Sequence, residues 1–142
     1  MKKKNYELNK NFKHDVKVQE IREKAIGELL QDKTIEIKTE MGMWKDTGNI
    51  AIELKFNGKP SGITKTEADY WWHSLELDDK PFAHIVFDTE TLRTHLKSLH
   101  KQGKVKKVVG GDDNLSEIAL VKLTELLNPQ NINYTKEQWL GL

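Results

Sequence analysis

The stretch TIEIKTEMGMWKDTGNIAIELKFNGKPSGITKTEADYWW, residues 34–72, holds the strongest structural signals of this chain. Residues 34–40 alternate apolar and polar side chains, and residues 50–56 repeat the alternation. A period of two is typical of strands that bury one face. Glycine and Asp-Thr-Gly-Asn between the two segments favour a turn. The sequence therefore predicts two strands that pair antiparallel.

Each expected strand carries a Glu-x-Lys motif on its polar face. Glu36 and Lys38 belong to the first strand, and Glu53 and Lys55 belong to the second. In a symmetric hairpin Glu36 would face Lys55 and Lys38 would face Glu53, with opposed Cβ atoms about 4.5–5.5 Å apart. The four charged groups would then form one patch. A bulge in the loop would shift this register.

Spacing alone leaves two interpretations of this patch open. Two carboxylates beside a lysine suit a divalent metal ion that acts on a phosphodiester, because Mg²⁺ takes carboxylate ligands and generates a nucleophile from water. Exposed cross-strand ion pairs have the same sequence pattern and contribute about 0.2–1 kcal/mol each. Since Glu and Lys are common on exposed strand faces, the motif alone favours ion pairs.

Further helices and strands are expected outside the two motifs. Apolar residues at three- and four-residue spacing predict helices over residues 15–30 and from about Glu90. A capping box at Thr64 and Glu67 predicts another helix. A buried strand is expected at residues 83–88, and two short strands at residues 105–109 and 117–123. This order predicts an α/β or α+β domain built on one mixed sheet.

Composition restricts the class of the 142-residue chain. With 37% hydrophobic and 32% charged residues it fits a globular domain. No apolar stretch reaches the roughly 18 residues of a membrane-spanning helix, and the absence of cysteine fits a cytoplasmic location. The five histidines lack HExxH spacing, which argues against a zinc enzyme. We expect a single domain over residues 1–142, with residues 1–12 as a basic tail.

Several blocks distributed over most of the chain follow a recognisable order. They are an acidic helix at 15–23, Ile-Glu-Ile-Lys at 35–38, Thr-Gly-Asn-Ile at 47–50, Pro-Ser-Gly-Ile at 60–63, Thr-Glu-Ala-Asp-Tyr-Trp at 66–71, Gly-Gly-Asp at 110–112 and Ala-Leu-Val at 119–121. In this order the chain resembles the small phage-type nucleases of the PD-(D/E)XK, or restriction-endonuclease-like, superfamily. The resemblance implies a restriction-endonuclease-like core, in which a mixed central sheet is flanked by helices. It also implies a DNA endonuclease or exonuclease that uses Mg²⁺ or Mn²⁺.

The resemblance suggests roles for four residues. Glu36 and Lys38 look like the acid-x-lysine pair of the superfamily, and Glu23 looks like its helix carboxylate. The chain departs from the pattern because no clear aspartate-bearing strand precedes Glu36. A second correspondence therefore stays open, with Glu36 as the first-strand acid and Glu53-x-Lys55 as the motif. We expect Glu36, Glu53 and Glu23 to bind metal and Lys38 to orient the attacking water or stabilise the transition state.

DNA is the expected partner, and its form is open. Lys45, Lys59 and Lys65 would hold the phosphate backbone, and Ser61 would place backbone amides against a phosphate; a plain turn is the alternative for Ser61. No membrane partner is expected. A homodimer is one expectation, since branched-DNA enzymes of this superfamily are often dimers. A phage-encoded protein acting in the host cytoplasm fits these expectations.

Other interpretations stay open beside this one. The chain could be a noncatalytic nucleic-acid-binding phage accessory protein on the same fold, or a module whose charged sheet face pairs with a protein. The lysines of residues 97–107 could contact phosphates or form a solvated surface. Trp71 and Trp72 could stack on bases, although their spacing favours the core. Asp15 could cap a helix, and Glu40 could simply be solvated.

Overall fold

The computed structural model describes residues 16–28 and 31–132, and the chain divides into two units, residues 1–34 and residues 35–142. The first unit contains a helix over residues 16–28, which confirms the predicted helix within the described residues. Asp15 and the expected basic tail at residues 1–12 lie outside them. The single nuclease-like domain expected over residues 1–142 stays a prediction. In the described ranges, no helix has the length and apolar character needed to cross a membrane.

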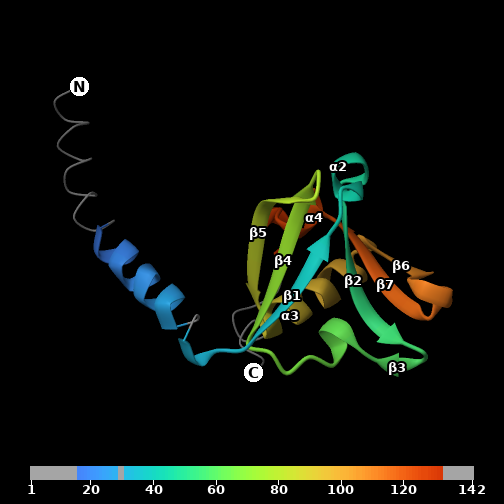
Figure 1. Cartoon of the computed structure of the whole chain (residues 1–142), viewed down its shortest axis with the longest axis horizontal. Coiled ribbons are helices and arrows are strands. Elements are labelled where there is room, and N and C mark those ends of the chain that lie inside the picture. Colours follow the sequence, from blue (N-terminus) through green and yellow to red (C-terminus); the bar gives the residue numbers. More distant parts are fainter. Residues whose placement is uncertain (1–15, 29–30, 133–142) are drawn as a thin grey trace. The chain divides into compact units, whose positions relative to one another are not determined.

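The described part of the second unit folds into two sheets (Figure 1). The first has the order β1-β4-β5, with β1 (Ile35–Glu40), β4 (Tyr70–Leu77) and β5 (Lys80–Asp88). The second has the order β3-β2-β7-β6, with β2 (Asn49–Phe56), β3 (Lys59–Pro60), β6 (Val105–Gly110) and β7 (Ser116–Lys122). β1 runs parallel to β4, and all other paired strands run antiparallel. The fold is therefore α+β with a mixed sheet, but the expectation of one single sheet is wrong.

Helices lie between these strands and after the last of them. The α-helices are α2 (Met43–Thr47), α3 (Thr89–Lys101) and α4 (Leu123–Leu126), and the 3₁₀ helices are η1 (Gly62–Thr64), η2 (Asp112–Asn114) and η3 (Pro129–Asn131). Both strands expected after residue 100 are confirmed as β6 and β7, and the helix expected from Glu90 is confirmed as α3. The side chain of Asp88 caps α3 by accepting a hydrogen bond from the amide of Thr91 at 2.9 Å.

The predicted hairpin of β1 and β2 is wrong. Glu36 lies beside Trp71 of β4, and Glu53 lies beside Ile118 of β7, so the two Glu-x-Lys motifs belong to different sheets. The connection is not a tight hairpin turn but the helix α2. Trp44 anchors α2 to β4 by donating from Nε1 to the carbonyl of Glu76 at 2.8 Å. The chain therefore leaves β1 and enters the second sheet.

The helix predicted after Thr64 is also wrong, because the segment forms β4. Trp71, His73 and Leu75 are buried on one face with exposures of 0%, 1% and 4%. β4 pairs with β1 on one side and β5 on the other, and aromatic residues favour strands. These contributions outweigh the local preference for a helix that the capping pattern indicated. That pattern occurs one turn earlier, where the hydroxyl of Thr64 accepts a hydrogen bond from the amide of Ser61 at 3.1 Å in η1.

β5 is a half-exposed edge strand rather than the expected buried one. Ala83, Ile85 and Phe87 pack against the core, whereas Phe82 and Val86 are 65% and 40% exposed. β5 pairs only with β4 in the described chain. An antiparallel strand at a sheet edge buries one face, and an apolar run does not reveal this by itself.

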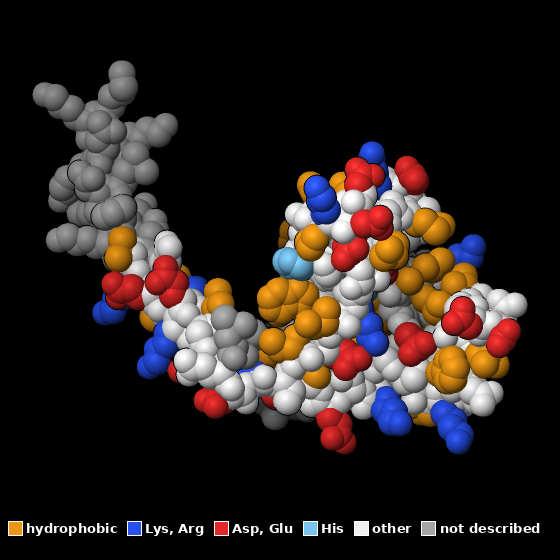
Figure 2. Space-filling model, viewed as in Figure 1, with side chains coloured by type: hydrophobic (Ala, Val, Ile, Leu, Met, Phe, Trp, Pro, Cys, Tyr) orange, Lys and Arg blue, Asp and Glu red, His pale blue; other side chains and the backbone are white. Residues whose placement is uncertain are grey.

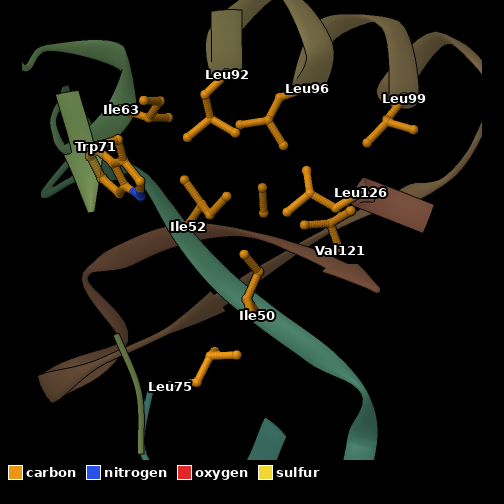
Figure 3. Packing of buried hydrophobic residues seen from close by; sticks show 11 residues of the cluster. Ile50, Ile52, Ile63, Trp71, Leu75, Leu92, Leu96, Leu99, Val121 and Leu126 are labelled. Atoms are coloured by element: carbon orange, nitrogen blue, oxygen red, sulfur yellow. The ribbon is translucent and has the colours of Figure 1, made fainter. Parts of the chain in front are cut away.

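One hydrophobic core joins both sheets to α3. Figure 3 shows Leu92, Leu96 and Leu99 of α3 pointing toward Ile52 of β2 and the strands behind it. Trp71 of β4 enters the same cluster and is fully buried. Because the two sheets share this cluster, burial of apolar surface holds them together without a continuous ladder of hydrogen bonds.

Asn131 secures the end of the described chain. It is 1% exposed, and its Nδ2 donates to the carbonyl oxygen and to Oε2 of Glu125, both at 2.7 Å. This hydrogen bond, together with the charge of Lys104, lowers the pKa of Glu125 below its ordinary value against an opposing contribution from burial. A side-chain network thus closes the fold after α4.

Gly62 is required by a close approach between η1 and β2. Its φ is +53°, and a Cβ there would lie 2.2 Å from the carbonyl oxygen of Glu53. We expect Gly62→Ala to lower the free energy of unfolding by about 3 kcal/mol, because both backbone strain and a clash with rigid backbone result. Chemical denaturation measures this loss.

Gly58→Ala is the matched control for this prediction. Gly58 also has a positive φ, +76°, but no atom lies within 4 Å of a Cβ placed there. We expect a loss of about 1 kcal/mol, from backbone strain alone. Equal losses in the two variants would show that the approach of η1 to β2 does not constrain the fold.

Candidate functional site

The candidate site lies in a fork between β1 and β2. In Figure 1 the two strands are close together at α2 and diverge toward η1. Figure 2 shows that the surface is hollowed between the two strands, with acidic and basic side chains beside the hollow. β1 contributes Glu36, Lys38 and Glu40, which are paired across the parallel ladder with residues of the core face of β4. A polar strand face therefore borders the core.

Glu40 closes the narrow end of the fork. Its carboxylate accepts hydrogen bonds from the amide of Ala51 on β2 and from Nε2 of His73 on β4, the latter at 2.9 Å. Glu40 is therefore a structural residue with a side chain only 15% exposed, not the solvated residue considered above. A carboxylate with charge-assisted hydrogen bonds to two strands of different sheets fixes the position of β1 against both.

The geometry also fixes the tautomer of His73. Nε1 of Trp71 lies 3.2 Å from Nδ1 of His73, and an indole nitrogen can only donate. Nδ1 therefore accepts, and the ring hydrogen is on Nε2, where it is donated to Glu40. Trp71, His73 and Glu40 form a directed chain of hydrogen bonds from the core to the fork. His73 was not among the predicted site residues, because the sequence pattern predicted a helix for this segment.

Glu36 and Lys38 form an ion pair further along the fork. Nζ of Lys38 lies 2.9 Å from Oε1 of Glu36, and the two side chains are 38% and 36% exposed. Nζ also lies 5.7 Å from the ring centroid of Trp71, within the range of a cation–π contact. Two separate contacts thus hold the ammonium group while leaving it accessible to solvent. This is a half-buried pair at the edge of the core.

A shallow pocket opens beside Glu36 at the wide end of the fork. Its lining comes from β1 and from η1 with the residues that follow it: Glu36, Ser61, Gly62, Lys65, Thr66 and Glu67. The structure thus brings Glu36 together with two predicted nucleic-acid contacts. It also adds Glu67, which the sequence analysis had assigned to a helix cap. The Pro-Ser-Gly-Ile block carried the signal for this wall of the pocket.

The other predicted site residues of the second unit are not among those that line this pocket. Glu53 accepts a hydrogen bond from Oγ of Ser116 at 2.9 Å, and its backbone supports Gly62 from behind. Lys55 lies 4.0 Å from Glu117 on β7. Lys45 on α2 and Lys59 on β3 are exposed. Glu23 is exposed on the helix of the first unit, which is described by itself.

The donor set near Glu36 has the chemistry of a site for a hard cation. Among the described residues, no group of three or more His, Cys, Asp or Glu side chains is placed to hold a metal ion. The predicted metal ligands Glu36 and Glu53 belong to different sheets of the second unit, and Glu23 belongs to the first unit, so this triad stays a prediction. Mg²⁺ is usually bound by one or two carboxylates together with water and phosphate, and Glu36 and Glu67 supply two.

Comparisons with protein-family models, with curated proteins and with solved structures found no match for this chain. The resemblance to PD-(D/E)XK nucleases and the restriction-endonuclease-like core therefore stay predictions.

Removal of the Glu40 carboxylate should destabilise the fold. We expect Glu40→Ala to lower the free energy of unfolding by about 2–4 kcal/mol, because two buried or partly buried donors lose their acceptor. Glu40→Gln keeps a carbonyl oxygen and should lose only about 1 kcal/mol. Urea denaturation distinguishes the two variants.

Thr39→Ala serves as the control on the same strand. Thr39 is exposed, and its replacement should change stability by less than about 0.5 kcal/mol. If Glu40→Ala were as stable as Thr39→Ala, the hydrogen bonds from Ala51 and His73 would not hold the fork together.

Proposed function

We propose that this protein is a DNA nuclease that depends on Mg²⁺ or Mn²⁺ and hydrolyses phosphodiester bonds at Glu36 and Lys38. The observation that supports this is the Glu36–Lys38 contact of 2.9 Å, because Glu36 also lines a pocket together with Lys65 and Glu67. A carboxylate, an ammonium group and a second carboxylate then border one accessible pocket. Such a set can bind a cation and a phosphate together.

Each residue has a chemical role in this proposal. A bound divalent ion would activate water and neutralise charge on the scissile phosphate. Glu36 and Glu67 supply the carboxylate oxygens that would hold it. Lys38, fixed by Glu36 and the ring of Trp71, would orient the attacking water or stabilise the negative charge of the transition state. Lys65, exposed on the opposite wall, would bind the adjacent phosphate.

The geometry favours Lys38 over Lys55 as the motif lysine. Lys38 is in contact with Glu36, whereas Lys55 approaches Glu117 in the other sheet. Of the two correspondences that the sequence left open, the proposal adopts the one centred on Glu36-x-Lys38. Glu53 then acts as a positioning residue, because its backbone supports the glycine that forms part of the pocket wall.

Cleavage assays test the proposal directly. Plasmid and branched DNA are incubated with wild-type protein, Glu36→Gln or Lys38→Ala, with Mg²⁺ or Mn²⁺. We expect each substitution to reduce the cleavage rate by about 100-fold or more, since each removes a group that binds or stabilises developing charge. Lys80→Ala is the control, because Lys80 is exposed and lines neither this pocket nor a neighbouring one, and it should retain the rate within about threefold.

Thermal denaturation of the same proteins excludes loss of folding as the cause. The Glu36–Lys38 pair is more than one-third exposed on each side, and exposed pairs contribute little to stability. Equal cleavage by all four proteins would overturn the site assignment. DNA binding without cleavage under either metal would instead support the noncatalytic alternative.

A further inference from the structure

A second concave surface lies between α3 and the four-stranded sheet. It is a groove of about 340 Å³. Its floor is apolar, because Leu54, Leu96, Val105 and Ala119 all belong to the hydrophobic core or pack against it. Core side chains that reach the surface at the bottom of a groove leave apolar area open to a ligand.

The rim of this groove is strongly basic. Lys97 and Lys101 of α3 face the groove together with Lys107 of β6, and all three are exposed. Lys55 also lies on the rim, but Glu117 is 4.0 Å from it. Glu117 is the only acidic residue among the described residues that line the groove. The groove therefore has three more lysines than acidic residues around an apolar floor. This surface is complementary to a ligand that has both negative charge and an apolar part.

We propose that this groove binds an unpaired segment of a DNA strand. The inference rests on the proposed nuclease function and names the form of DNA that it takes. Lys97 and Lys101 are one helical turn apart, about 6 Å along the axis, which suits successive contacts to the phosphates of one strand. Lys107 faces the strand from β6. An unpaired base lies against the apolar floor, as bases do between apolar side chains once they leave the stack.

The groove and the Glu36 pocket are joined by η1. Thr64, the last residue of η1, lines the groove, whereas Ser61, Gly62 and Lys65 of the same turn line the pocket. A strand held by Lys97 and its neighbours can therefore pass over η1 and present a phosphodiester to Glu36. A blunt duplex cannot place a base on the floor without breaking a pair, so the groove favours unpaired DNA over paired DNA.

Fluorescence anisotropy in EDTA tests the inference without cleavage. The probe is a labelled single strand of about 12 nucleotides, and a blunt hairpin duplex is measured beside it. We expect the full-length wild-type protein to bind the single strand at least tenfold tighter than the duplex. The triple variant Lys97→Gln, Lys101→Gln and Lys107→Gln should lose at least tenfold in affinity. Its slope of log affinity against log salt should fall by about 2, as expected for three lost phosphate contacts.

A second triple variant controls for net charge. Lys80, Lys106 and Lys122 are exposed and do not line the groove, so their replacement by Gln removes the same charge elsewhere. We expect this variant to keep single-strand affinity within about threefold. Equal losses in the two variants, or equal affinity for strand and duplex, would overturn the inference. So would displacement of the strand by a glutamate-rich peptide at an equal concentration of charges, because the occupant would then be an acidic protein segment.

The outcome is separable from that of the nuclease proposal. Strand binding is measured in EDTA and cleavage is measured with the metal, so the two readouts are independent. Strand binding that depends on the groove lysines, without cleavage, would reject the nuclease proposal and keep the groove. Cleavage that depends on Glu36, with unchanged binding by the groove variant, would reject the groove alone.

Discussion

The carboxylate of Glu40 is the interaction on which the arrangement of the two sheets depends. β1 and β2 are consecutive in the chain but belong to different sheets, and no strand ladder connects them. Glu40 accepts from the backbone of β2 and from His73 of β4, so one side chain replaces a ladder at the point where the strands separate. Beyond it the strands diverge, and the space between them becomes the fork. A continuous hairpin would have filled this space with main-chain hydrogen bonds.

The polar face of β1 follows from the same arrangement. In a buried parallel strand both faces are usually apolar, but β1 pairs only with β4 in the described chain and borders the fork on its other side. Its charged residues can therefore face the core side of the sheet while remaining in contact with solvent. Lys38 illustrates this, because its half-exposed ammonium group contacts both the ring of Trp71 and the carboxylate of Glu36.

Local sequence signals predicted the elements well and their partners badly. Alternation revealed β1 and β2, and the leucine spacing revealed α3, because each pattern is contained within one segment. The parallel pairing of Glu36 with Trp71 spans 35 positions and leaves no local mark. The capping pattern at Thr64 predicted a helix because it is a local signal. The segment instead forms β4, which is stabilised by pairing with β1 and β5 on its two sides.

The candidate site shows the same division between local and non-local information. Glu36 and Lys38 are two residues apart on one strand, so their proximity follows from strand geometry alone. The proximity of Glu36 to Ser61 and Lys65 does not follow from strand geometry, because it requires η1 to approach β2 closely. Gly62 permits that approach, since any Cβ would meet the backbone of Glu53. The Pro-Ser-Gly-Ile block therefore indicates the close approach of η1 to β2. A sequence pattern that contains this block is more specific than Glu-x-Lys alone.

The position of η1 explains how one short turn can serve two surfaces. Gly62 lines the Glu36 pocket and Thr64 lines the basic groove, and hydrogen bonds of Thr64 and Ser61 to the carbonyl of Leu54 attach the turn to β2. A turn held in this way cannot move toward one surface without changing the other. Binding in the groove and chemistry at Glu36 would therefore be coupled through the same backbone. Because the coupling element is rigid, a strand held in the groove would position its phosphate at the pocket rather than remodel it.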